Sequence, residues 1–180
     1  MESAMRAVVL TVLAVFGHAI LAQDTPPNKT QAPLNFEDTM AWLRTYVLGS
    51  TQMKVGTDPT HPNESFGQHY TTFEWSGCSV AAVRTNWTTT GKKETQTYKF
   101  NFVDLDPTDI RLRTNPIYDD YTNVELLVSD GKMKIKTLWH DDKWYNTAAV
   151  DFTFSPTTAP HVTKAFRHAI ELCGGKASAF

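Results

Sequence analysis

The residues best suited to chemistry form one short cluster in the last third of the chain. The cluster consists of Trp139, His140, Asp141, Asp142, Trp144 and Tyr145, placed around Lys143. An imidazole beside two carboxylates could bind a divalent metal or orient a water molecule, and the three aromatic rings could stack on a sugar. Asp-Asp-Lys is also ordinary turn chemistry, and adjacent residues of a tight turn point in different directions. A hairpin turn therefore explains the cluster without a ligand, while ligand contact and catalysis are the competing hypotheses.

Sequence signatures of common enzyme classes are absent from the chain. It contains no Gly-x-Ser-x-Gly, no His-Glu-x-x-His, no Cys-x-x-Cys and no phosphate-binding glycine loop. These motifs carry nucleophiles, metal ligands or phosphate contacts at fixed spacing, so their absence lowers the expectation for those enzyme classes. An active site assembled from distant residues is still compatible with the sequence. We predict neither a cofactor nor a bound metal.

Basic residues occupy every second position in two short segments of the sequence. Lys132, Lys134 and Lys136 form one set, and Arg111 and Arg113 form the other. If their strands were close, a basic patch suited to an anionic polysaccharide or phospholipid would result. Lysines on a strand face can instead keep the sheet soluble and discourage edge pairing. The formal net charge of -2 predicts no general attraction to nucleic acid.

The first 22 residues have the layout of a secretory signal peptide. Arg6 precedes an apolar run, Ala7 to Phe16, and small residues follow up to Ala22, where cleavage is expected. An uncleaved N-terminal anchor is the alternative. The segment 23–34 is polar and contains three prolines, so we expect a flexible lead-in. The mature chain is predicted to be secreted or periplasmic.

Export changes the interpretation of the two cysteines. Cys78 and Cys173 both lie in the predicted mature chain, and an oxidising compartment makes a disulfide between them plausible. Two buried free thiols are the alternative. A nucleophilic Cys78 is a third hypothesis, although no thiol-activating motif lies near it in the sequence.

Two amphipathic helices are expected to position these residues. Asn35 can cap a helix over 36–48, and apolar residues recur through it at steps of four and three. A second helix is predicted over 158–173, with Phe166 and Ile170 as its buried anchors. The segment 49–68 between the first helix and the strands has no periodicity, and we expect a mobile loop.

A period of two appears after residue 69 and predicts seven strands within 70–154. The strand candidates are Tyr70–Trp75, Ser79–Asn86, Thr95–Leu105, Ile110–Thr114, Val124–Ser129, Met133–Trp139 and Trp144–Phe154. Because short turns separate them, we expect consecutive strands to pair as an antiparallel meander. The predicted core face holds Tyr98, Phe100, Phe102, Ile110, Leu112, Val124, Leu126, Val128, Met133, Ile135, Val150, Phe152 and Phe154. The predicted outward positions include Lys99, Arg111, Arg113, Lys132, Lys134, Lys136 and Asp151.

These elements predict an α+β fold that is mostly β, formed by one globular domain over 35–176. A sheet that is apolar on one face must curl over to bury that face, so we expect a seven-stranded, partly open antiparallel barrel or sandwich. The C-terminal helix would cap it, and the N-terminal helix would dock on the same body. This order of strands and helix resembles the pleckstrin-homology-like superfold. The resemblance implies no phosphoinositide binding here, because the loop Ser76-Gly77-Cys78 lacks the basic residues that the family uses.

Two further segments carry a second resemblance. Asp38-Thr-Met-Ala-Trp-Leu43 and Ala165-Phe-Arg-His-Ala-Ile-Glu-Leu-Cys-Gly-Gly175 resemble segments of small exported bacterial proteins of unknown function. We therefore predict an exported, non-enzymatic binding or interaction module of the bacterial envelope or periplasm. Its partner would be a protein, a glycan or a small apolar ligand. The alternatives are a carrier of a lipid or small apolar molecule, and a hydrolase that uses His140 with Asp141 or Asp142.

Overall fold

The computed structural model describes residues 35–54, 65–115 and 118–178. The predicted signal peptide and lead-in, and half of the predicted loop over 49–68, lie outside these residues. The two helices are α1 (Phe36–Gly49) and α2 (Ala159–Leu172), and a short 3-10 helix, η1, spans Phe102–Asp104. The strands are β1 (Thr51–Lys54), β2 (Phe66–Ser76), β3 (Ser79–Thr88), β4 (Lys93–Asn101), β5 (Leu105–Asn115), β6 (Tyr118–Val128), β7 (Ile135–Leu138), β8 (Trp144–Thr147) and β9 (Ala149–Phe154).

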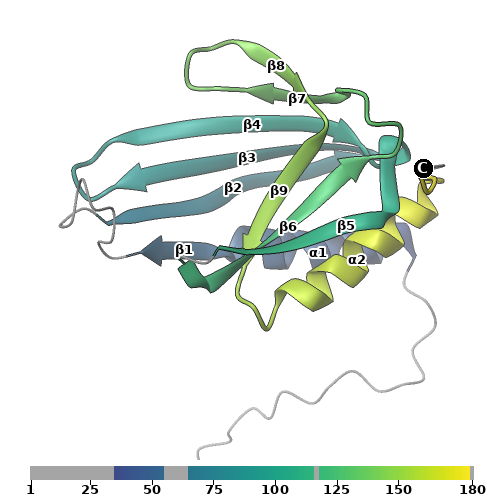
Figure 1. Ribbon diagram of the computed structural model, residues 1–180, viewed down its shortest axis with the longest axis horizontal. Helices are drawn as coiled ribbons and strands as arrows, with labels where there is room; N and C mark the ends of the chain where they lie inside the picture. Colours follow the sequence, from purple (N-terminus) through teal and green to yellow (C-terminus); the bar gives the residue numbers. More distant parts are fainter. Residues whose placement is uncertain (1–34, 55–64, 116–117, 179–180) are drawn as a thin grey trace, which may run out of the picture. The chain divides into compact units, whose positions relative to one another are not determined.

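The strands form two antiparallel sheets, so the mostly-β α+β prediction is confirmed (Figure 1). The large sheet has the strand order β1-β2-β3-β4-β7-β8, and the small sheet has the order β5-β6-β9. The predicted simple meander is wrong, because the chain changes sheet after β4, after β6 and after β8. The predicted strand Trp144–Phe154 is two strands, β8 and β9, that belong to different sheets. The segment predicted as a loop over 49–68 contributes β1 and the start of β2.

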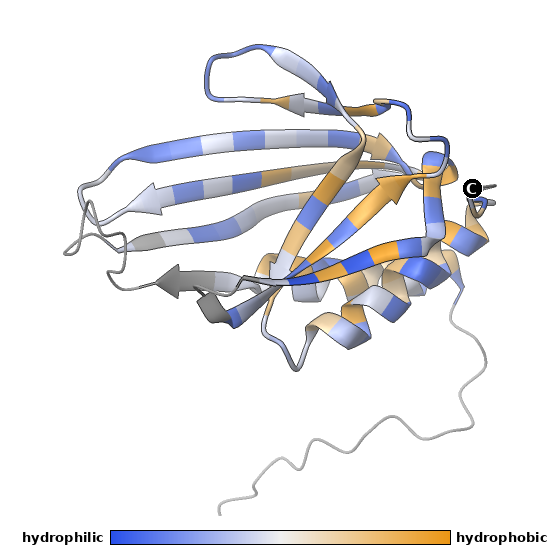
Figure 2. Cartoon of the chain, viewed as in Figure 1, coloured by the Kyte–Doolittle hydropathy of each residue, from blue (hydrophilic) through white to orange (hydrophobic). Residues whose placement is uncertain are grey.

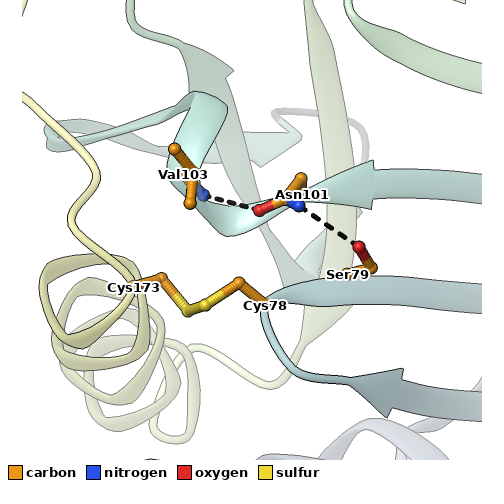
Figure 3. Close-up of a disulfide and its surroundings, with 5 residues drawn as sticks. All are labelled: Cys78, Ser79, Asn101, Val103 and Cys173. Carbon is orange, nitrogen blue, oxygen red and sulfur yellow. Dashed lines mark hydrogen bonds between the residues drawn. A yellow bond between two sulfur atoms is a disulfide. The ribbon is translucent and has the colours of Figure 1, made fainter.

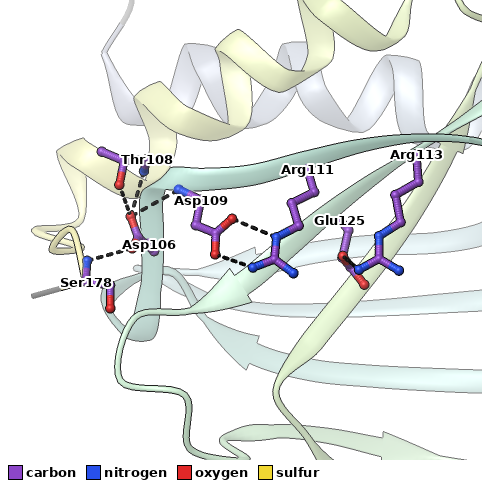
Figure 4. Close-up of polar contacts among 7 residues, drawn as sticks. All are labelled: Asp106, Thr108, Asp109, Arg111, Arg113, Glu125 and Ser178. Atoms are coloured by element: carbon purple, nitrogen blue, oxygen red, sulfur yellow. Dashed lines mark hydrogen bonds and ion pairs between the residues drawn. The ribbon is translucent and has the colours of Figure 1, made fainter. Parts of the chain in front are cut away.

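A capped turn directs the chain from the large sheet to the small one. The side chain of Asn101 begins η1 by accepting a hydrogen bond from the Val103 N–H at 3.0 Å. The buried carboxylate of Asp106 then accepts bonds from the N–H groups of Thr108, at 2.7 Å, and Ser178, at 2.6 Å (Figure 4). Burial opposes ionisation of Asp106, but these hydrogen bonds keep the pKa of its carboxyl below the ordinary value. Asp106 thereby fixes both the start of β5 and the tail after α2.

Both predicted helices are present, and their apolar faces form part of the core. Asn35 caps α1 as expected, with its side-chain oxygen accepting from the Asp38 N–H at 2.9 Å. Phe166 and Ile170 of α2 are completely buried, as predicted. The helix α2 packs on α1 and on strands of the small sheet, and Figure 2 shows apolar residues concentrated where these elements meet.

Aromatic rings fill the centre of the core. The ring of Phe152 lies 5.0 Å from that of Phe166 and 6.0 Å from that of Phe73, measured between centroids. Phe100 and Phe102 extend the cluster, with their centroids 5.6 Å apart. The contacts of Phe152 with Phe73 and of Phe100 with Phe102 are edge-to-face, an arrangement that adds to the stabilisation from apolar burial.

Two residues assigned to the core face are exposed instead. Met133 is 68% exposed because it lies in the turn before β7, which begins only at Ile135. Leu112 is 47% exposed, although Val124, its partner across the strand pair, is completely buried. The core ends between these two residues because β5 is an edge strand of the small sheet. The other predicted core positions are buried, apart from the partly buried Ile110.

A disulfide joins Cys78 to Cys173, as one of the sequence hypotheses proposed. The Sγ–Sγ distance is 2.08 Å and the Cα–Cα distance is 5.8 Å (Figure 3). The bond connects the turn between β2 and β3 to the end of α2. Within the described part of the chain, neither helix has the length and apolar character needed to cross a membrane.

Candidate functional site

The cluster singled out in the sequence forms the turn between β7 and β8. The backbone N–H of Trp139 donates to the carbonyl of Lys143 at 3.2 Å, and Asp142 adopts a positive φ of 57°. Asp141 accepts a hydrogen bond from the Tyr145 hydroxyl at 2.8 Å and another from the Lys143 N–H at 3.2 Å. The bond from Tyr145 is the main cause that lowers the pKa of Asp141. Both oxygens of this carboxylate therefore have a role in the turn itself.

The same turn does not assemble a metal centre. His140 is exposed, and its ring lies edge-on to Trp139 with centroids 6.4 Å apart. Among the described residues, no three His, Cys, Asp or Glu side chains form a group that could hold a metal ion. The aromatic residues remain accessible, since Trp144 is 47% exposed and Tyr145 is 45% exposed.

A second set of polar residues lies beside this hairpin, on the outer face of the large sheet. Strand register places Glu74 opposite Ala81, Ala81 opposite Lys99, and Lys99 opposite Lys136. We call these four residues the outer row. Residues directly opposite in neighbouring strands project from the same face of a sheet. The small side chain of Ala81 therefore leaves a hollow between Glu74 and Lys99.

An open groove of about 530 Å³ coincides with the outer row. Its lining comprises Glu74, Trp75, Ser76, Ser79, Val80, Ala81, Lys99, Phe100, Asn101, Asp104, Lys134 and Lys136. Trp144 lies next to the groove, because the Lys99 Nζ is 5.1 Å from the centroid of its ring. A cation over an indole ring is attracted by the negative face of the π system. The contact connects the groove to the aromatic hairpin.

The three lysines of the groove differ in their partners. Lys134 Nζ forms ion pairs with Asp104 at 2.9 Å and Asp130 at 3.0 Å. The hydrogen bond from Lys134 lowers the pKa of Asp130, and the bonds to both carboxylates raise the pKa of Lys134. Lys99 and Lys136 form no ion pair with a carboxylate of the described residues, although they face each other across β4 and β7. The positive charge of the groove is therefore concentrated on this pair.

The end of the groove near the disulfide is held by hydrogen bonds. Asn101 uses its oxygen to cap η1 and donates from Nδ2 to the Ser79 Oγ at 3.2 Å (Figure 3). Because Ser79 accepts this bond, its own hydroxyl hydrogen can be donated to another group. Cys78, the residue before Ser79, is fixed by its bond to Cys173. This end of the groove is thus tied to α2 through covalent structure.

A different polar cluster occupies the inner face of the large sheet. Arg84 donates to Asp151 Oδ2 at 3.0 Å and to the side-chain oxygen of Gln96. The Tyr98 hydroxyl donates to the same Gln96 oxygen at 2.7 Å, and the Tyr70 hydroxyl donates to the Asp151 carbonyl at 2.6 Å. The Arg84 side chain is 12% exposed and that of Asp151 is 37% exposed. These bonds join β2, β3 and β4 of the large sheet to β9 of the small sheet.

Burial governs the titration of this inner cluster. It is the largest cause that raises the pKa of both Tyr70 and Tyr98, with Asp151 contributing in the same direction. Burial also opposes the charge on Arg84, but the neighbouring tyrosines and Asp151 raise its pKa above the ordinary value. The Nε of Arg84 is buried and has no hydrogen-bond partner in the described part of the chain. Asp151 was predicted to face outward, and its pairing with Arg84 was not foreseen.

The two predicted sets of basic residues do not combine into one patch. Arg111 and Arg113 lie on β5 of the small sheet, whereas β7, which contains Lys136, belongs to the large sheet. Arg111 pairs with Asp109 at 2.8 Å, and Arg113 pairs with Glu125 at 2.9 Å (Figure 4). Lys132 and Lys134 precede β7, and Lys134 lines the groove with Lys136 but pairs with Asp104 and Asp130. The groove was missed because it depends on Glu74, Ala81 and Lys99, which only the register of several strands brings together.

Comparisons with known proteins do not assign the groove to a family. No protein-family model, no curated protein and no solved structure matched the chain.

Proposed function

We propose that this chain is an exported, non-enzymatic binding module that binds a glycan in the groove of the outer row. The observation that supports the proposal is the position of Trp144, a half-exposed indole held beside a groove that is lined with polar groups. Export to the bacterial envelope or periplasm, which the N-terminal segment predicts, is part of the same proposal. So is a partly open barrel related to the pleckstrin-homology-like superfold.

Sugar recognition needs an apolar surface and several directional polar groups at the same place. Trp144 offers the apolar surface, because an aromatic ring can pack against the C–H groups of a sugar ring. Ser79 offers a hydroxyl donor, Glu74 offers a carboxylate acceptor, and Lys99 offers ammonium donors. All three stand on strands of one sheet, which positions them more rigidly than loops would.

Neither alternative function receives comparable support. The hydrolase hypothesis uses His140 with Asp141 or Asp142. Both oxygens of Asp141 accept hydrogen bonds within the turn, and Tyr145 lowers its pKa. His140 and Asp142 are exposed side chains of the same turn. In the carrier hypothesis an apolar ligand would enter between the sheets, yet the rings of Phe73, Phe152 and Phe166 pack there against one another. The accessible polar groove favours binding at the surface.

The test is a glycan-array screen of the purified, oxidised mature chain. We expect binding to a subset of glycans, with affinity reduced by about tenfold or more in Trp144→Ala, because stacking on an exposed indole contributes on the order of 1 to 2 kcal/mol. Trp139→Ala is the matched control, since it removes an indole from the same hairpin but leaves the ring that contacts Lys99 in place. Failure to bind any glycan, or equal binding by Trp144→Ala and wild type, would overturn the proposal.

A further inference from the structure

We infer that the glycan is acidic and that a sugar carboxylate binds between Lys99 and Lys136 in the outer row. This inference rests on the proposed function and specifies the chemistry of the same groove. It adds a charge requirement that glycan binding alone does not contain.

The first argument is the register of the two lysines. Lys99 and Lys136 are direct partners across β4 and β7, where side chains on one face start about 5 Å apart. Like charges placed directly opposite one another destabilise a sheet. A carboxylate between the two ammonium groups would convert this repulsion into two charge-assisted hydrogen bonds. The arrangement of the two lysines is therefore more favourable with an anion bound than without one.

The second argument is that one of the two lysines is oriented by its surroundings. The ammonium group of Lys99 is held 5.1 Å from the centre of the Trp144 ring. A lysine restrained in this way loses less freedom when it binds a ligand than a lysine that moves freely in water. The same contact brings the cation next to the indole, so that one sugar residue can reach both.

The third argument concerns Glu74, on the side of the groove opposite the lysines. Its carboxylate favours a sugar acid over a phospholipid surface or a nucleic acid. Glu74 lies two strands away from Lys99, with Ala81 between them, a separation of about 10 Å. This leaves room for one sugar ring, whose hydroxyl groups can donate to Glu74 while its carboxylate contacts the lysines. A dense array of phosphates would instead bring negative charge against Glu74 and the nearby Asp104.

The ionic partners of Lys134 complete the distribution of charge. Since Asp104 and Asp130 already pair with Lys134, this lysine adds little net charge to the groove. The attraction for an anion is thus local to Lys99 and Lys136, at one end of the outer row. A ligand with one carboxylate per sugar residue fits this local charge.

The experiment compares acidic polymers with neutral polymers that have the same rings and linkages. Oligosaccharides of polygalacturonate, alginate and hyaluronate are titrated calorimetrically into the oxidised mature chain, each beside its carboxyl-reduced counterpart. Neutral glycans from the array screen are measured in the same series. The variant Lys99→Gln/Lys136→Gln removes the pair, and Lys164→Gln/Lys176→Gln removes the same charge from exposed positions outside the groove. Thermal unfolding confirms that each variant is folded.

We expect at least one acidic polymer to bind about tenfold or more tightly than its reduced counterpart, since the sugar carboxylate gains an ion pair with each of the two lysines. Lys99→Gln/Lys136→Gln should abolish this preference, the control variant should retain it, and added salt should weaken it. Binding of neutral and acidic polymers with equal affinity would overturn the acidic-ligand inference and leave the glycan proposal standing. Failure of every glycan to bind would overturn both.

Discussion

Tyr98 and Lys99 are adjacent in β4, yet they take part in cation–aromatic contacts on opposite faces of the same sheet. On the inner face, the Arg84 guanidinium lies 5.4 Å from the centroid of the Tyr98 ring. On the outer face, the Lys99 ammonium lies 5.1 Å from the centroid of the Trp144 ring. The two contacts have similar geometry, but their surroundings give them different consequences.

The inner contact is compensated by partners within the protein. Asp151 neutralises Arg84, and Gln96 accepts from both Arg84 and Tyr98. A buried ion pair of this kind is no sure source of stability, but removal of one member leaves an unpaired buried charge. Because Asp151 comes from the small sheet, the contact also specifies how the two sheets meet. We interpret it as structural.

The outer contact lacks this compensation. Lys99 faces Lys136 instead of a carboxylate, and the Trp144 ring is half exposed. A residue arrangement that weakens the free protein while leaving polar and aromatic groups accessible is typical of a binding surface. The comparison teaches that the partners of a cation, more than its contact with a ring, distinguish a structural cluster from a ligand site.

The largest change in stability should come from removal of the disulfide, which holds the chain just before β3. Replacement of Cys78 and Cys173 by serine should lower the free energy of unfolding by about 4 kcal/mol, because the bond closes a long loop in the unfolded chain. The sequence separation of the two cysteines is 95. Urea denaturation at neutral pH measures the effect, with the reduced wild-type chain as control. A loss below about 1 kcal/mol would contradict the expected role of the bond.

The next largest effect is expected from Arg84→Met, which should change stability without changing glycan binding. We expect a loss of about 2 to 3 kcal/mol in the free energy of unfolding, which is below the usual range for a buried pair because Asp151 is partly exposed. Glycan affinity should not change in this variant. Lys99→Met is the matched comparison, since it should reduce affinity and leave stability within about 0.5 kcal/mol of wild type. If Arg84→Met lost binding but kept its stability, the assignment of the two faces would be reversed.

Alkaline pH should lower the stability of the protein through the two buried tyrosines of the inner cluster. Burial raises the pKa of Tyr70 and Tyr98, so the folded chain retains their protons at a pH where the unfolded chain has lost them. Stability should therefore be unaffected below the unfolded tyrosine value near pH 10, and should fall above it by about 1.4 kcal/mol per pH unit for each such group. Urea titrations between pH 8 and 11.5 measure the slope, and Tyr98→Phe should reduce it. An unchanged slope in Tyr98→Phe would show that Tyr98 does not contribute.

Lys136→Glu should produce the smallest change in stability, and it should stabilise the protein instead of destabilising it. A carboxylate opposite Lys99 replaces repulsion by attraction, so the free energy of unfolding should rise by roughly 0.2 to 1 kcal/mol. Binding of an acidic glycan should be lost in the same variant. Lys136→Gln, which only removes the repulsion, should fall between wild type and Lys136→Glu in stability. A destabilised Lys136→Glu chain would show that the two lysines do not repel one another.

The sequence predicted local structure better than the connections between strands. The cap at Asn35, the buried stripe of α2 and the disulfide follow from local spacing or from cysteine chemistry, and all three are present. The alternation from Trp144 to Phe154 continues without a visible break although the chain changes sheet inside it. A period of two reports which residues share a face, but it does not report which strand pairs with which.

The candidate site shows the same division. The turn chemistry of Asp141 could be foreseen from neighbouring residues, whereas the outer row requires the registers of β2, β3, β4 and β7 at once. Lys99 was assigned outward from alternation alone, without a reason to connect it to Trp144. The partner of Arg84 was missed for a similar reason, since Asp151 lies in another sheet and reaches the arginine only in the folded chain.

The central claim is that the outer row binds an acidic sugar while the inner cluster holds the sheets together. The most direct measurement is a titration of the isotopically labelled mature chain with a polygalacturonate oligosaccharide, followed by amide NMR shifts. We predict that the shifts concentrate at Ser79, Ala81, Lys99, Lys136 and Trp144, and that they disappear with the carboxyl-reduced oligosaccharide. Shifts centred on the small sheet or α2, or equal shifts with both oligosaccharides, would contradict the account.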